Sequence, residues 1–272
     1  MKQQINYIIS QLRGFYPEEE LREIAYWVVE ETTGMTRTEI LSGCKDTQNI
    51  PNIEIILQKL RAHQPIQYIF GHTEWMGLDL YVSPATLIPR PETAELTEWV
   101  LSKCDSKKTL RILDIGTGSG CIALALKQRA PLWSVTGMDI SEEALKVAKE
   151  NAQHNKLHVD WIQTNILSTI NLPTFDCIVS NPPYICDSER HTMDTRVLDY
   201  EPHSALFVPD NDALLFYKKI ASLKIAPMLF FEINEAYGAE ICNMLQQLGY
   251  DNIILKRDMY GKDRMVFATI NC

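Results

Sequence analysis

Apolar residues recur with a helical period in two segments near the start of the chain. In residues 18–31 they fall at the i, i+3, i+4, i+7 and i+8 positions of one helix face, held by Leu21, Ile24, Ala25, Val28 and Val29. A second helix is predicted over about residues 51–63, whose apolar side consists of Ile53, Ile56, Leu57 and Leu60. Because no strand pattern separates the two helices, residues 1–65 predict a small helical bundle.

Residues 66–90 have a different pattern. Aromatic and β-branched residues are divided by Gly71 and Gly77, which predicts a short hairpin. Pro84 and Pro89 then mark a connection that is too apolar for a flexible linker. We therefore expect a hairpin and connector over residues 66–90, followed by a separate domain over residues 91–272.

From residue 91 onward, helical and strand patterns alternate. Helices are predicted over 92–103, 121–130, 142–155, 212–223 and 240–250, with Ser141 as the N-cap of the third. Buried strands are predicted over 110–115, 135–140, 159–166, 175–181, 227–234, 252–257 and 264–270. This alternation predicts an α/β fold with a doubly wound, Rossmann-like sheet, covered by helices on both faces. The last two strands are joined by a short polar turn and should pair antiparallel at one edge.

Composition restricts the class of protein. The 272 residues are 46% hydrophobic and 22% charged, as in a soluble globular protein, and the net charge of −9 disfavours a nucleic-acid partner. No signal peptide or membrane-spanning run is visible, so we expect a cytoplasmic protein without a membrane partner. The number of cysteines is odd, and no two of them form a CxxC pair, which predicts reduced thiols and no metal site. The cysteines are Cys44, Cys104, Cys121, Cys177, Cys186, Cys242 and Cys272.

A glycine-rich segment, Asp114-Ile115-Gly116-Thr117-Gly118-Ser119-Gly120, lies between a predicted strand and helix. Glycines allow a tight turn and close approach of a ligand. The spacing is G-x-G-x-G and Asp114 disfavours an anion, so a cationic ligand such as S-adenosylmethionine fits better than a dinucleotide. Asp139 ends the next strand, about 20 residues on, where a carboxylate can accept both ribose hydroxyls. The alternative is a glycine-rich turn without a ligand.

The next strand is followed by Asn165 and Ile166, in the place that borders the adenine in such sheets. The side-chain oxygen of Asn165 could accept from an adenine amino group, and Ile166 could pack on the ring. Asn165 could equally be a turn residue that uses its side chain locally. The sequence leaves both interpretations open.

The tetrapeptide Asn181-Pro182-Pro183-Tyr184 comes at the end of the fourth predicted strand and should face the same crevice as the glycine loop. The prolines remove backbone donors and leave carbonyl oxygen, Asn181 adds an acceptor and two donors, and Tyr184 adds an aromatic wall. Such a group can hold both hydrogens of a planar –NH2. An amide or aromatic amine needs this for methylation, because its nitrogen lone pair is delocalised. The alternative is an ordinary proline-rich turn.

In these residues the chain resembles the class I S-adenosylmethionine-dependent methyltransferases that act on planar amines, and more narrowly the release factor glutamine methyltransferase family. The motifs PIQYIFG, LIPRPET, DIGTGSG, SNPPYI, YEPHSAL and YGKDR fall in the order of that family. The resemblance covers nearly the whole chain. It implies a seven-stranded methyltransferase domain over residues 91–272, a substrate-docking helical domain over 1–65, and methylation of the glutamine in the GGQ motif of peptide-chain release factors.

The resemblance also assigns roles to individual residues. The cofactor S-adenosylmethionine would be bound by Asp114, Gly116, Thr117, Gly118, Ser119, Gly120, Asp139, Asn165, Ile166 and Asn181. Catalysis and binding of the glutamine would involve Asn181, Pro182, Pro183 and Tyr184, with Arg90, Glu201 and Pro202 near the pocket. Arg90 could instead form a structural ion pair. The family more often carries an aspartate and an aromatic residue where this chain has Asn165 and Ile166.

Three other functions compete with this one. They are methylation of a ribosomal-protein glutamine, N-methylation of an amino group on a nucleic-acid base, and nucleoside binding by a non-catalytic adaptor. The acidic net charge disfavours nucleic acid, and the intact Asn-Pro-Pro-Tyr motif disfavours the adaptor. The helical N-terminal region favours a protein substrate, because a separate module can dock a partner.

Overall fold

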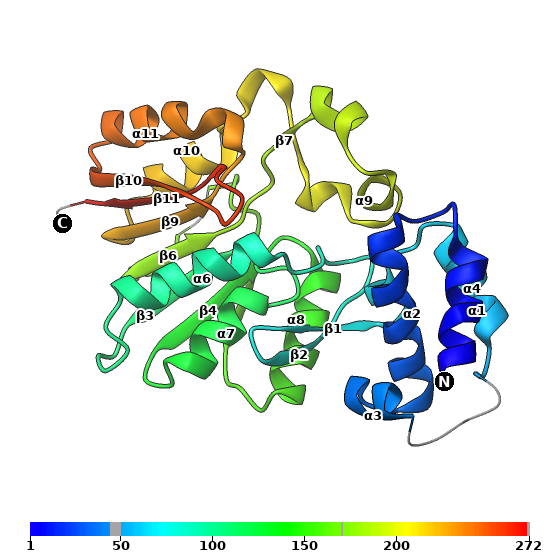
Figure 1. Ribbon diagram of the computed structural model, residues 1–272. Coiled ribbons are helices and arrows are strands. Elements are labelled where there is room, and N and C mark those ends of the chain that lie inside the picture. Colours follow the sequence, from blue (N-terminus) through cyan, green and yellow to red (C-terminus); the bar gives the residue numbers. More distant parts are fainter. Residues whose placement is uncertain (44–49, 170, 271–272) are drawn as a thin grey trace. The chain divides into compact units, whose positions relative to one another are not determined.

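The structure is a computed structural model that describes residues 1–43, 50–169 and 171–270 (Figure 1). It contains two compact units. The first comprises Met1–Gly71 together with Thr195–Tyr200, and the second comprises His72–Asp194 and Glu201–Cys272. Cys44 and Cys272 lie outside the described residues; Cys104, Cys121, Cys177, Cys186 and Cys242 are free thiols. Within the described ranges, no helix is long and apolar enough to cross a membrane.

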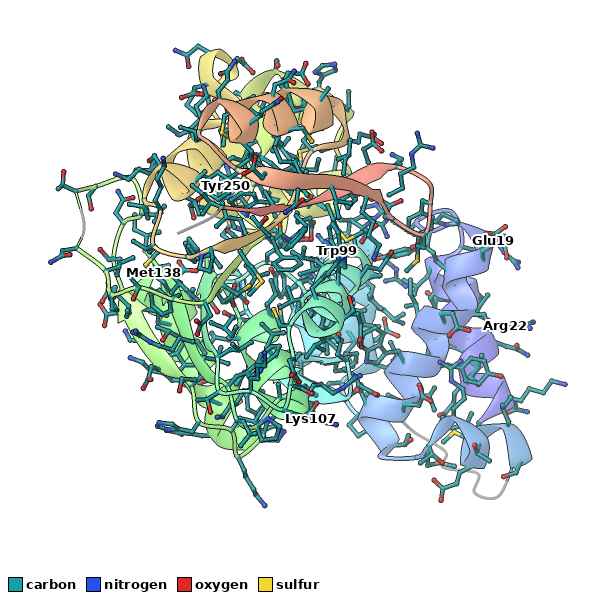
Figure 2. The ribbon with its side chains drawn as sticks, turned by 90° about the vertical axis from the view of Figure 1, so that its left-hand side faces the viewer. Glu19, Arg22, Trp99, Lys107, Met138 and Tyr250 are labelled. Carbon is teal, nitrogen blue, oxygen red and sulfur yellow. The ribbon has the colours of Figure 1, made fainter. Side chains whose placement is uncertain are left out.

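The first unit is helical, with its own apolar core. Its helices are α1 (Lys2–Leu12), α2 (Glu18–Thr33), α3 (Arg37–Ser42), α4 (Ile53–Arg61), α5 (Ile66–Phe70) and α9 (Thr195–Tyr200). The helices predicted over 18–31 and 51–63 are confirmed as α2 and α4. Helix α2 ends at Gly34, whose left-handed backbone (φ 68°) closes the helix. Glu19 and Arg22 lie on the exposed side of α2 (Figure 2).

Two segments differ from the sequence-based prediction. Residues 66–70, expected in the hairpin, form α5, because Pro65 precedes its first turn and Gly71 (φ 81°) ends it. The hairpin itself is β1 (His72–Trp75) and β2 (Leu78–Tyr81), which pair antiparallel. Helix α9 was expected only as part of a loop. It belongs to the first unit, where Arg196 pairs with Glu20 at 2.9 Å.

The second unit contains a seven-stranded sheet in the order β10-β11-β9-β6-β3-β4-β5. Its strands are β3 (Arg111–Ile115), β4 (Ser134–Asp139), β5 (Asp160–Gln163), β6 (Cys177–Ser180), β9 (Met228–Glu232), β10 (Asp251–Arg257) and β11 (Asp263–Thr269). The strands β5, β4, β3, β6 and β9 run parallel, while β11 is antiparallel to β9 and β10. The predicted α/β fold with an antiparallel edge is confirmed.

Helices cover both faces of this sheet (Figure 1). On one side lie α6 (Pro91–Lys103), α7 (Cys121–Arg129) and α8 (Glu142–His154), and on the other α10 (Leu215–Ser222) and α11 (Gly238–Gln247). Because side chains alternate along a strand, Phe230 packs against Trp99 in one core while its neighbour Phe231 packs against Tyr217 in the other. Figure 2 labels one residue of each core: Trp99 belongs to the first and Tyr250 to the second.

The loop-rich stretch after β6 carries only short elements. A two-stranded parallel sheet is formed by β7 (Ile185–Cys186) and β8 (Phe207–Val208). Short 3₁₀ helices lie there at η1 (Asp187–Thr192), η2 (His203–Ala205) and η3 (Asp210–Asp212), and a further one, η4 (Glu235–Tyr237), follows β9.

Candidate active site

The carboxyl ends of four parallel strands, β3, β4, β5 and β6, meet at a cavity of about 320 Å³ in the second unit. Ligands of open α/β sheets bind at this edge. Four of the segments that line the cavity follow these strands directly: residues 115–119, 138–141, 164–167 and 181–183. Other parts of the second unit, among them Arg90, Thr93 and Pro202, complete the lining. The glycine loop and the Asn-Pro-Pro segment, predicted to share one crevice, therefore do so.

The glycine loop is docked on the end of β4. The N–H groups of Gly116 and Thr117 both donate to the carbonyl of Met138, at 2.8 and 3.0 Å. At Gly116, a Cβ would lie 3.7 Å from the carbonyl oxygen of Asn181, which places this loop beside the Asn-Pro-Pro-Tyr segment. Gly120 has a left-handed backbone (φ 83°), and a Cβ there would meet Trp161 at 3.1 Å. The loop thus needs glycine both for its shape and for its packing.

Asp114 lies beneath this loop and does not itself line the cavity. Its Oδ2 accepts from Thr117 Oγ1 at 2.6 Å and from the N–H of Ala123 at 3.2 Å, so it joins the loop to the start of α7. No donor among the described residues reaches its buried Oδ1. Burial raises the pKa of Asp114 to about 7. A cationic donor nearby would therefore stabilise its ionised form.

Stability should depend on pH through Asp114. Because its pKa rises from 3.8 to about 7 on folding, the folded state holds a proton that the unfolded state releases. This contribution is complete below the unfolded pKa and is lost as pH rises through 7. We expect it to remove about 2–3 kcal/mol of unfolding free energy between about pH 5 and pH 8, and Asp114→Asn to lack that loss. Urea unfolding of both proteins across this range is the measurement, and equal slopes would exclude Asp114 as the cause.

Asp139, at the end of β4, lines the cavity with a fixed carboxylate. Its Oδ2 accepts from the N–H of Gly118 and its Oδ1 from the N–H of Ser141, both at 2.9 Å. Each carboxylate oxygen retains further acceptor capacity. Asp139 therefore holds the glycine loop against α8 and can still accept hydrogen bonds from a ligand.

Asn165 and Ile166 both line the cavity, as the sequence predicts for residues next to an adenine. The side-chain oxygen of Asn165 accepts from the N–H of Leu167 at 2.9 Å, and its backbone carbonyl accepts from Ser168. Of the two interpretations left open by the sequence, the local turn is the one observed. Contact with an adenine remains a prediction for both residues.

The residues of the Asn-Pro-Pro-Tyr segment do not all face the cavity. Asn181, Pro182 and Pro183 line the cavity, whereas Tyr184 does not. The hydroxyl of Tyr184 donates to Glu232 Oε1 at 3.1 Å, and burial raises its pKa. The aromatic side chain is thereby anchored behind the segment.

Arg90 forms an ion pair with Glu201, and both residues belong to the second unit. Glu201 is 4% exposed and also accepts from the N–H of Ile88 at 3.2 Å. Arg90 and Pro202 line the cavity, and Glu201 does not. The structural ion pair considered for Arg90 is therefore present, and it fixes one wall of the cavity.

Known proteins share both sequence and fold with this chain. Residues 94–199 match the Methyltransferase small domain family. The chain is 43% identical to the release factor glutamine methyltransferase of Flavobacterium psychrophilum over 95% of both chains, and 39% identical to that of Bacteroides thetaiotaomicron over 96% of this chain and 97% of the other. The chain belongs to the release factor glutamine methyltransferase family. The resemblance inferred from its motifs is thus confirmed.

The fold of this release factor glutamine methyltransferase family member is also found in solved structures. Human methyltransferase 10 domain containing protein superposes with a TM-score of 0.54 at 20% identity, over 72% of this chain and 90% of the other. At such low identity the likeness establishes the methyltransferase fold alone.

Two polar residues at this family member's site were not predicted from its sequence. Thr93, in the first turn of α6, accepts from Asn181 Nδ2 at 3.1 Å and donates to Glu232 Oε2 at 2.6 Å. Glu232 also accepts from Tyr184. One signal was available in the sequence, because Glu232 is a carboxylate at the end of the otherwise apolar strand MLFFE. Thr93 is the last residue of the LIPRPET motif, but the motif by itself assigns no role to its hydroxyl.

Proposed function

We propose that this chain transfers a methyl group from S-adenosylmethionine to the side-chain amide nitrogen of the glutamine in the GGQ motif of a peptide-chain release factor. The observation that carries the proposal is that Asn181 and Pro182 line the same cavity as Asp139 and the glycine loop. The names of relatives at 43% and 39% identity support the choice of substrate.

The cavity residues fit the proposed cofactor. Asp139 offers acceptor capacity for ribose hydroxyls, the loop from Gly116 to Ser119 allows close approach of the methionine part, and Ile166 offers an apolar surface to the base. Gly120, which the resemblance also assigns to the cofactor, does not line the cavity and packs against Trp161. The buried Oδ1 of Asp114, which no donor among the described residues reaches, fits a cation near the loop. When bound, S-adenosylmethionine supplies a methyl group activated by a positively charged sulfur.

The residues of the Asn-Pro-Pro-Tyr segment would prepare the amide nitrogen. Neither Pro182 nor Pro183 has a backbone N–H, so the segment presents acceptors to an –NH2 group. Hydrogen bonds from the amine to fixed acceptors favour the pyramidal nitrogen of the transition state and stabilise the charge that develops on it. Alignment of the amide nitrogen with the methyl group in the cavity would supply the remainder of the rate enhancement. Such a site needs no strong general base.

The first unit, which contains residues 1–65, is proposed to dock the protein substrate. It has an apolar core of its own, and Leu41 and Ile55 are 67% and 55% exposed. We expect the double variant Leu41→Asp/Ile55→Asp to raise KM for release factor about tenfold with kcat unchanged, because docking contacts contribute equally to the ground and transition states. Leu132→Asp, equally exposed at 56% in the second unit, is the matched control. An unchanged KM in the double variant would place the docking surface elsewhere.

The function is tested by offering the protein competing substrates. Release factor, the same release factor with its GGQ glutamine changed to alanine, ribosomal proteins and RNA are each incubated with enzyme and methyl-labelled cofactor. We expect label only in the unaltered release factor. Label in ribosomal protein or RNA, with none in release factor, would support a competing function instead.

A further inference from the structure

Glu232, the last residue of β9, is a buried carboxylate next to the proposed site. It is 2% exposed and accepts from two hydroxyls, Thr93 Oγ1 at 2.6 Å and Tyr184 at 3.1 Å. The sheet register accounts for its place. Ser180 on β6 pairs with Phe231 on β9, so the residues that follow them, including Glu232, lie at the same level. A carboxylate is therefore held directly beside the Asn-Pro-Pro-Tyr segment.

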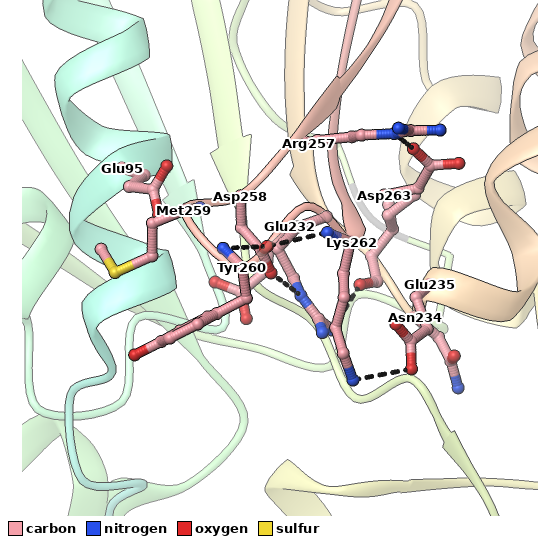
Figure 3. A network of polar contacts seen from close by, with 12 residues as sticks. Glu95, Glu232, Asn234, Glu235, Arg257, Asp258, Met259, Tyr260, Lys262 and Asp263 are labelled. Carbon is pink, nitrogen blue, oxygen red and sulfur yellow. Dashed lines mark hydrogen bonds and ion pairs between the residues drawn. The ribbon is translucent and has the colours of Figure 1, made fainter.

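The turn between β10 and β11 places a positive charge near this carboxylate. Arg264 donates from Nε to Asp258 Oδ2 and from Nη1 to the carbonyl of Ile233, both at 3.2 Å. Asp258 is fixed in turn by the N–H groups of Tyr260 and Lys262, at 2.9 and 3.0 Å (Figure 3). Arg264 is the last residue of the YGKDR motif and the second of β11, and Asp258 in the preceding turn orients it.

The surroundings of Glu232 act on its charge in opposite directions. Burial raises the pKa of Glu232, as does the nearby carboxylate of Glu92. The hydrogen bonds from Thr93 and Tyr184 and the positive charge of Arg264 lower it. Burial is the largest of these effects, so the pKa of Glu232 is raised overall, while the three groups oppose this rise and favour the ionised form.

An ionised Glu232 fixes the direction of the hydrogen bonds next to it. A carboxylate can only accept, so the single hydroxyl proton of Thr93 is donated to Glu232. The oxygen of Thr93 is left as an acceptor, and it accepts from Asn181 Nδ2 at 3.1 Å. Partners of this kind decide which way an asparagine amide is turned. With its –NH2 end on Thr93, Asn181 keeps Oδ1 for the substrate.

We propose that Glu232 is a positioning residue for methyl transfer, which acts through Thr93 to orient the Asn181 amide so that Oδ1 receives a hydrogen of the substrate –NH2. The inference rests on the proposed function, because it names the group that prepares Asn181 for an amide substrate. Through its other oxygen, the same carboxylate anchors Tyr184. Glu232 does not line the cavity, so it would act on the substrate only through its neighbours.

We call the chain of hydrogen bonds from Glu232 through Thr93 to Asn181 the relay. The test breaks the relay at two points with substitutions that keep the size of the side chain. Thr93→Val replaces the hydroxyl by a methyl group, and Thr93→Ser retains the hydroxyl as the matched control. Glu232→Gln offers one acceptor and one –NH2 to two hydroxyls, so one of them loses its acceptor. Single-turnover methyl transfer to release factor is measured for each variant and for Thr93→Val/Glu232→Gln. Calorimetric titration with S-adenosylhomocysteine follows cofactor affinity.

We expect Thr93→Val and Glu232→Gln each to lower the single-turnover rate about 10²-fold with cofactor affinity unchanged, since a misplaced reacting group costs about that much. Thr93→Ser should stay close to wild type. The double variant should be no slower than the slower single variant, because both break one relay. A Thr93→Val rate close to wild type, or effects that multiply in the double variant, would overturn the proposal. Should Glu232→Gln fail to fold, the valine and serine variants decide alone.

A second measurement does not depend on the substrate. The side-chain amide of Asn181 is followed by nitrogen–proton NMR, its signal identified by its loss in Asn181→Ala. The signal should move in Thr93→Val and Glu232→Gln and stay in place in Thr93→Ser. An unmoved signal in both of the first two variants would contradict the relay. A wild-type enzyme that leaves release factor unmethylated would contradict the proposed function, and this spectrum would still test the role of Glu232.

Discussion

Asn181→Ala is expected to lower the single-turnover rate of methyl transfer by about 10²–10³-fold, the usual effect of removing one preorganised hydrogen-bonding group. The variant removes the acceptor offered to the substrate amine and leaves Thr93 Oγ1 without its donor. The resemblance also assigns Asn181 to the cofactor, but Asp139 and the glycine loop remain, so affinity for S-adenosylhomocysteine should stay close to that of the wild type. Rapid-quench methyl transfer and calorimetric titration separate the two effects.

Asn181→Asp is the sharper comparison for this position. It preserves the shape and the acceptor oxygens, but a carboxylate has no –NH2 to give to Thr93. It would also place a second negative charge near Glu232, which is buried. We expect this variant to fail nearly as severely as alanine. Near-normal transfer by Asn181→Ala would remove the Asn-Pro-Pro-Tyr segment from its role in holding the amine.

Asp139→Ala is expected to weaken cofactor binding strongly without unfolding the protein. Each charge-assisted hydrogen bond to a ribose hydroxyl contributes about 1.5–3 kcal/mol, so loss of two corresponds to a Kd at least about 10²-fold higher. Release of the N–H groups of Gly118 and Ser141 should loosen the loop and add to the effect. Calorimetric titration with S-adenosylhomocysteine measures it.

Two variants serve as controls for Asp139. Glu142→Ala removes a carboxylate from the next helix, where it forms an exposed ion pair with Lys146, and cofactor affinity should not change. Asp139→Asn retains one acceptor and should lie between wild type and alanine. Unchanged affinity in Asp139→Ala would remove this residue from the cofactor site.

The sequence predicts those parts of the site whose residues lie in short motifs directly after predicted strands. The glycine loop is bounded by a buried strand and a helix, and Asp139 ends the neighbouring strand, so the carboxyl-end rule for parallel sheets places them together. The Asn-Pro-Pro segment follows β6, and its place in the cavity is explained by the same rule. Local pattern and sheet topology are sufficient in these cases.

Other features depend on contacts that no local pattern contains. Thr93 and Glu232 are 139 positions apart in the chain and meet only because α6 packs over the sheet beside β9. Residues 66–70 have a strand-like composition, but Pro65 and Gly71 provide helix ends that override it. Helix α9 joins the first unit through Arg196 and Glu20, a partly buried pair from distant parts of the chain. The local turn at Asn165 became visible only when its side chain was seen to accept from Leu167, and its contact with an adenine stays a prediction.

The most direct test of the central claim is peptide mapping by mass spectrometry of release factor after incubation with S-adenosylmethionine and either wild-type protein or Asn181→Ala. The proposed function predicts one added methyl group, on the side-chain amide of the GGQ glutamine, with wild-type protein and almost none with the variant in the same time. A methyl group on another residue, equal modification by Asn181→Ala, or an unmodified release factor would contradict it.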